Sequence, residues 1–94
     1  MTLEQFRRTL AKSGPPAEMS APLASLWWAA KGDWERAHGI VMDAGGKEAA
    51  WVHAYLHRVE GDLANARYWY GQAGRKAPNA PLATEWEDIA RSLL

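Results

Sequence analysis

Apolar side chains recur every three or four residues along most of this 94-residue chain, which predicts amphipathic helices. No run of five or more residues alternates between apolar and polar side chains as a half-buried strand does. Glycine, proline and aspartate separate the periodic segments. We therefore expect an all-α single domain of about six helices. Its parts are an N-terminal helix at 2–13, a first helical hairpin at 20–44, a second hairpin at 47–78 and a C-terminal capping helix at 80–94.

The segment from about Lys47 to Glu60 differs from the others because its apolar residues surround most of the helix. A helix that is apolar on several sides is usually buried on several sides. We expect this helix to lie at the centre of the domain.

Two Gly-Asp breaks are the most informative local pattern. Gly32-Asp33 and Gly61-Asp62 each lie between two helical segments, and each is followed four residues after the aspartate by an alanine, Ala37 or Ala66. Glycine tolerates the conformation that ends one helix, and aspartate caps the start of the next. The small alanine lets two antiparallel helices approach closely, so each break predicts a helical hairpin.

The second hairpin resembles a tetratricopeptide repeat over about 34 residues, from Lys47 to Ala80. Its small, aromatic and proline positions match the repeat in register: Ala54, Ala66, Tyr70, Ala73 and Pro78. The first hairpin matches at fewer positions, Ala37, Val41 and Ala44, and is shorter than a full repeat. The stretches 29–38 and 50–74 are also similar to small bacterial proteins of unassigned function.

The resemblance implies stacked hairpins that act as a non-enzymatic protein–protein interaction module. It places Trp51, Tyr55 and Arg58 on the concave face formed by the first helix of each pair. Trp28 is a further aromatic candidate for this contact surface. The expected partner is a protein or peptide of unknown identity. A homo-oligomer is also plausible, because the chain is short, aromatic-rich and nearly neutral.

An alternative function is a small-ligand or metal site at one edge of the fourth helix. His53, His57 and Glu60 lie at i, i+4 and i+7, within one polar stripe. Two histidines at i, i+4 can bind one metal ion, and a carboxylate can complete the site. The other interpretation is that both histidines pack between helices and donate hydrogen bonds to a neighbour. His38 could join the site only if the third helix faces the same stripe.

Composition excludes several other classes of function. Eleven basic residues balance eleven acidic ones, so the basic excess that drives nucleic-acid binding is absent. The chain has no cysteine, which removes disulfides and thiolate chemistry. No signal peptide or membrane-spanning run is present, so the expected location is the cytoplasm. We find no catalytic motif, and the leading hypothesis requires no cofactor and no metal.

The six tryptophans are numerous for so short a chain. Four of them lie on the apolar stripes of predicted helices and are expected in the core: Trp27, Trp34, Trp69 and Trp86. Trp28 and Trp51 lie beside a stripe, so the pattern leaves their environment open.

Overall fold

The computed structural model describes all 94 residues and contains six α-helices and no strand. The helices are α1 (Leu3–Thr9), α2 (Ala21–Ala30), α3 (Trp34–Asp43), α4 (Lys47–Val59), α5 (Leu63–Ala73) and α6 (Leu82–Leu93). The all-α fold of about six helices predicted from the sequence is confirmed. No helix has the length and apolar character needed to cross a bilayer.

Two helices end earlier than the apolar pattern predicts. After Thr9, the chain makes i to i−3 backbone hydrogen bonds at Leu10, Ala11 and Lys12, so the first helix gives way to a turn before residue 13. The fifth helix stops at Ala73 because Gly74 adopts a left-handed conformation, with φ of 71°. Residues 74–81 then form a connection to α6 in place of a longer helix.

Both Gly-Asp breaks form the predicted turns. Gly32 and Gly61 have φ of 80° and 85°, a region that favours glycine because it has no Cβ atom. The Asp33 side chain accepts a hydrogen bond from the Arg36 backbone N–H, and Asp62 accepts one from the Asn65 N–H. Each turn therefore ends one helix and caps the next within three residues.

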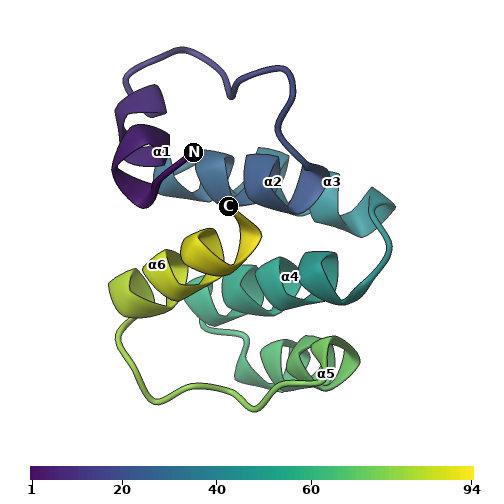
Figure 1. The fold of residues 1–94 in the computed structure, drawn as a ribbon. Coiled ribbons are helices and arrows are strands. Elements are labelled where there is room, and N and C mark those ends of the chain that lie inside the picture. Colours follow the sequence, from purple (N-terminus) through teal and green to yellow (C-terminus); the bar gives the residue numbers. More distant parts are fainter.

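Helix α4 lies at the centre of the molecule and packs against α2, α3, α5 and α6. Figure 1 shows α2 and α3 on one side of it and α5 on the other, with α6 in front. The nine consecutive residues from Ala49 to His57 are buried, which confirms the central position expected for this segment. The radius of gyration of 12.1 Å is typical of one compact domain of this length.

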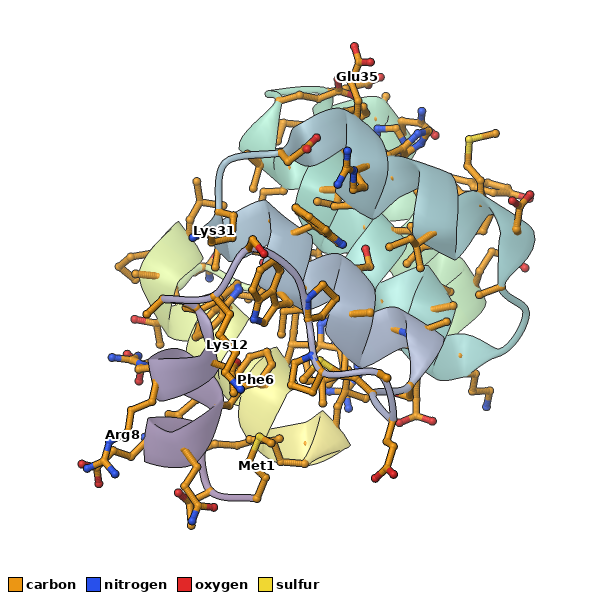
Figure 2. The ribbon with its side chains drawn as sticks, turned by 90° about the horizontal axis from the view of Figure 1, so that it is seen from above. Met1, Phe6, Arg8, Lys12, Lys31 and Glu35 are labelled. Atoms are coloured by element: carbon orange, nitrogen blue, oxygen red, sulfur yellow. The ribbon has the colours of Figure 1, made fainter.

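Helix α6 packs against α2 and α4, and α1 covers α6 from the other side. Trp86 of α6 stacks on Phe6 of α1 with ring centroids 5.6 Å apart, and its indole N–H donates to the Leu26 carbonyl. Figure 2 shows Phe6 pointing inward from α1, whereas Arg8, two residues further along the same helix, points away from the molecule. The two terminal helices thus complete the core that the hairpins leave open.

The tryptophans divide into two groups. Trp27, Trp51 and Trp86 are buried, whereas Trp28, Trp34 and Trp69 are half-buried and pack against the core from its edge. Trp28 contacts Trp27 edge to face and is covered by the Arg36 guanidinium, which lies 4.3 Å from its ring centroid.

Candidate functional site

Three histidines from two helices converge at the contact between α3 and α4. His38 comes from α3, and His53 and His57 come from successive turns of α4. One ring nitrogen from each lies within 4.8 Å of the others. The Nε2 atoms of His38 and His53 are 3.0 Å apart. We call these three residues the histidine cluster.

Two tryptophans hold the imidazole rings in place. Trp34 stacks on His38 with ring centroids 4.6 Å apart, and Trp69 of α5 stacks on His53 at 3.9 Å. The Trp34 indole N–H donates to the Leu56 carbonyl over 2.7 Å, which fixes α3 against α4 at this level. Stacking on both sides leaves the imidazole planes few alternative orientations.

Burial favours the neutral form of His38 and His53. His53 is 4% exposed, and burial, followed by the neighbouring His38 and His57, lowers its pKa to about 4. The pKa of His38 is also lowered, first by burial and then by His57, against an opposing effect of Glu60. Neutral imidazole is the form that binds metal ions. His38 and His53 are therefore in the form that can bind a metal ion at neutral pH.

Glu60 lies against His57 rather than completing a ligand set with both histidines of α4. Its Oε1 is 2.6 Å from His57 Nδ1. A carboxylate bound to one imidazole nitrogen fixes the ring and directs the other nitrogen away from it. The structure therefore gives Glu60 the position of an orienting group against His57 Nδ1.

The sequence predicted that His38 would join the site only if its helix faced His53 and His57. His53 and His57 share a helix, so their spacing alone predicts that they are neighbours. His38 joins them because α3 packs on α4 with its Trp34–His38 edge toward that stripe. The signal in the sequence was the i, i+4 spacing of Trp34 and His38. The rotation of α3 relative to α4 decided whether His38 reached the other two histidines.

His53 Nδ1 is the one buried side-chain polar atom without a hydrogen-bond partner. His53 Nε2 meets His38 Nε2, and at least one nitrogen of that pair must carry a proton for a hydrogen bond to form. A buried polar atom without a partner costs roughly 1–3 kcal/mol. The histidine cluster therefore lowers the stability of the fold relative to apolar side chains at the same positions.

The expected contact face is occupied by the chain itself. Trp51 and Tyr55 are 8% and 7% exposed, and the Arg58 side chain is 19% exposed, because α6 covers them. This corrects the expectation of an open concave surface at these residues. We call the surface that α6 covers the α2/α4 face. Trp28, the fourth predicted contact residue, lies elsewhere, beneath Arg36.

Glu85 of α6 is the polar centre of this packing. The residue is 2% exposed and accepts hydrogen bonds from Tyr70 Oη at 2.6 and 2.8 Å and from Arg58 Nη1 at 2.9 Å. The Trp51 indole N–H lies 3.4 Å from the same carboxylate. Arg58 also donates to the Ala80 carbonyl, which anchors the connection before α6. From the sequence, Glu85 belonged only to an acidic first turn, and no local signal indicated its burial.

Comparison with protein-family models, with curated proteins and with solved structures gives no match to this chain.

Proposed function

We propose that this protein binds a divalent transition-metal ion of the zinc class through His38, His53 and His57. The observation that carries the proposal is the convergence of three imidazoles within 4.8 Å, from two helices that need no rearrangement to bring them together. Imidazole nitrogen suits zinc, cobalt, nickel and copper, whereas calcium and magnesium prefer oxygen ligands. The site therefore favours the first group of ions.

The geometry requires only small shifts to accept an ion. Zinc–nitrogen bonds of about 2.0–2.1 Å in a tetrahedral arrangement place two ligand nitrogens about 3.3 Å apart. His38 Nε2 and His53 Nε2 are 3.0 Å apart, slightly closer than that. An ion between them would replace the hydrogen bond of the imidazole pair with two metal bonds. The carboxylate of Glu60 would support the third ligand from behind.

The first test is a titration of tag-free protein with Zn²⁺ and Co²⁺, followed by calorimetry and by the visible spectrum of the cobalt form. We expect one ion per chain and the intense absorption of four-coordinate cobalt. His38→Ala should weaken binding by more than about 100-fold, because it removes a ligand rather than a group behind one. Glu35→Gln is the matched control, since Glu35 is on the same helix and points away from the molecule (Figure 2). Equal affinity of His38→Ala and Glu35→Gln would exclude this site.

A second variant examines Glu60. Glu60→Gln keeps the shape of the side chain and removes its charge, so it should lower zinc affinity by about 10–100-fold and leave the stoichiometry at one. Affinity as low as that of His38→Ala would instead make Glu60 a direct ligand.

Protein–protein interaction is the second candidate function, and the feature that favours it is the α2/α4 face. That face already accommodates one amphipathic helix, α6, through Trp51 and Arg58 of α4, which surround the buried Glu85 carboxylate together with Tyr70 of the neighbouring α5. A partner helix would have to displace α6 to reach it. Glu85→Ala should therefore increase capture of a partner, or self-association seen by light scattering, relative to the control Glu87→Ala. Equal behaviour of the two variants would exclude the α2/α4 face as the binding surface.

A further inference from the structure

Helix α6 fills most of the α2/α4 face but leaves a pocket of about 360 Å³ at one end. Four helices contribute to its wall or rim: α1, α2, α4 and α6. Its six lining residues are mostly apolar: Arg7, Leu10, Ala30, Tyr55, Ala83 and Trp86. The volume lies within the range of small-molecule sites, which are mostly apolar with a few placed polar groups.

The two buried tyrosines beside α6 differ in their hydroxyl groups. Tyr70 donates to Glu85, and that hydrogen bond is one of the causes of its raised pKa. The Tyr55 hydroxyl has no hydrogen-bond partner in the chain, and its pKa is raised by burial and by the charge of Glu85 without such a bond. A buried phenol usually finds an acceptor. The Tyr55 hydroxyl stays open to the pocket, where water or a bound ligand can accept its hydrogen bond.

We propose that this pocket binds a small neutral apolar molecule that accepts one hydrogen bond from Tyr55. The proposal is independent of the histidine cluster, none of whose members lines the pocket.

Charge around the pocket favours a neutral ligand. Arg7 is the only ionised residue of the lining, and its guanidinium is paired with Glu87 of α6 at 2.5 Å. Near Tyr55 the Glu85 carboxylate is paired with Arg58, so these two charges oppose each other and neither is free to attract a charged ligand. The remaining indole donor, Trp86 Nε1, is already engaged by the Leu26 carbonyl. Tyr55 is therefore the one polar group free to orient the ligand.

Size sets the second limit. An apolar cavity of about 150 Å³ accepts one benzene ring. A pocket of about 360 Å³ therefore suits a molecule of two fused rings or a short branched chain. The chemical class is a carbonyl or ether compound of that size, with its oxygen directed at Tyr55.

Coumarin and naphthalene form a matched pair of probes, because both are neutral two-ring molecules and only coumarin has a carbonyl acceptor. Titration of the wild-type protein, followed by the six indole N–H signals in two-dimensional NMR, should shift the Trp86 signal saturably. We expect coumarin to bind about 3–10-fold more tightly than naphthalene, the factor that one net hydrogen bond provides. Equal affinities, or shifts confined to tryptophans outside the pocket, would overturn the proposal.

Two variants and one control complete the test. Tyr55→Phe keeps the ring and removes the hydroxyl, so it should reduce coumarin binding to the level of naphthalene and leave naphthalene unchanged. Ala83→Leu extends a side chain into the pocket and should abolish binding of both probes. Ala64→Leu adds the same bulk at an exposed position of α5 and should bind as the wild type does. Retained binding of both probes in folded Ala83→Leu would place the ligand elsewhere and refute the assignment.

Discussion

At the scale of single residues, the partners of a buried polar group decide what that group contributes. The Glu85 carboxylate is nearly inaccessible to water, yet Arg58 and Tyr70 both donate to it. Desolvation of a charge is offset only while such partners are present. His53 shows the opposite case, with one ring nitrogen unpaired in the same molecule. The polar core therefore has one fully paired centre, at Glu85, and one incompletely paired centre, at His53.

Glu85→Ala should destabilise the fold by about 3–5 kcal/mol, because Arg58 and Tyr70 lose their shared acceptor while both stay largely buried. Urea denaturation measures the change. Glu4→Ala is the control: its ion pair with Arg8 is 77% and 74% exposed on the two side chains, so its loss should cost about 0.5 kcal/mol or less. Similar losses in the two variants would contradict the role given to Glu85.

The raised pKa of Tyr55 predicts that the free energy of unfolding decreases at alkaline pH. Burial, then Glu85, raises its pKa from 10.0 to about 12 against an opposing effect of Arg58. In this interval the unfolded chain has lost the phenol proton and the folded chain retains it, so the free energy of unfolding falls as pH rises. Two pKa units correspond to about 2–3 kcal/mol, lost mainly between pH 10 and 12.

Denaturation of the wild type and of Tyr55→Phe at several alkaline pH values measures this effect. Tyr70 contributes a change of the same sign to both proteins, because its pKa is also raised, by burial first and by its hydrogen bond to Glu85 next. The difference between the two proteins therefore isolates Tyr55, and the phenylalanine variant should lose less stability. Parallel curves would contradict the buried environment assigned to the Tyr55 side chain.

At the scale of elements, each Gly-Asp turn performs two tasks within two residues. The glycine supplies the positive φ that ends a helix, and the aspartate caps the next helix. Both tasks depend on local backbone geometry, so they are readable from the sequence. Glycines inside helices have no such task, and a Cβ atom added at Gly39 would meet no other atom within 4 Å.

Gly61→Ala and Gly39→Ala should therefore change stability in opposite directions. At Gly61, with φ of 85°, alanine is strained and should destabilise the protein by about 1 kcal/mol or more. At Gly39, inside α3, alanine should stabilise it by about 0.5–1 kcal/mol. Thermal denaturation of the pair tests this. A gain in stability at Gly61 would contradict the turn described here.

At the scale of the whole molecule, the histidine cluster joins α3 to α4, the helix against which most of the fold packs. A metal ion bound there would connect elements that unfold together. Binding to the folded state alone stabilises it by about 2.7 kcal/mol at a ligand concentration of 100 times Kd.

Zinc at that concentration should raise the Tm by about 10 °C or more, since each kcal/mol shifts a domain of this size by several degrees. The shift should grow with zinc concentration and disappear in His38→Ala. Differential scanning calorimetry after chelator treatment provides the metal-free reference. An unchanged Tm in the wild type would contradict the proposed function without affecting the pocket at Tyr55.

The sequence by itself determined the local structure. Helix type, the two Gly-Asp hairpin turns, the central place of α4 and the neighbouring positions of His53 and His57 follow from periodicity and capping, which act over a few residues. The predicted ends at residues 13 and 78 were too late, because periodicity does not reveal where a turn or a left-handed glycine stops the helix.

Tertiary structure decided which distant residues meet. His38 reaches His53 only through the rotation of α3 against α4, and Glu85 reaches Arg58 and Tyr70 only because α6 folds back on α2 and α4. Either contact depends on the packing of whole helices, to which many side chains contribute small energies at once. The spacing of residues along one helix does not reveal how whole helices pack against each other. The position of His38 in the cluster and the covering of the contact face by α6 could therefore be found only from the tertiary structure.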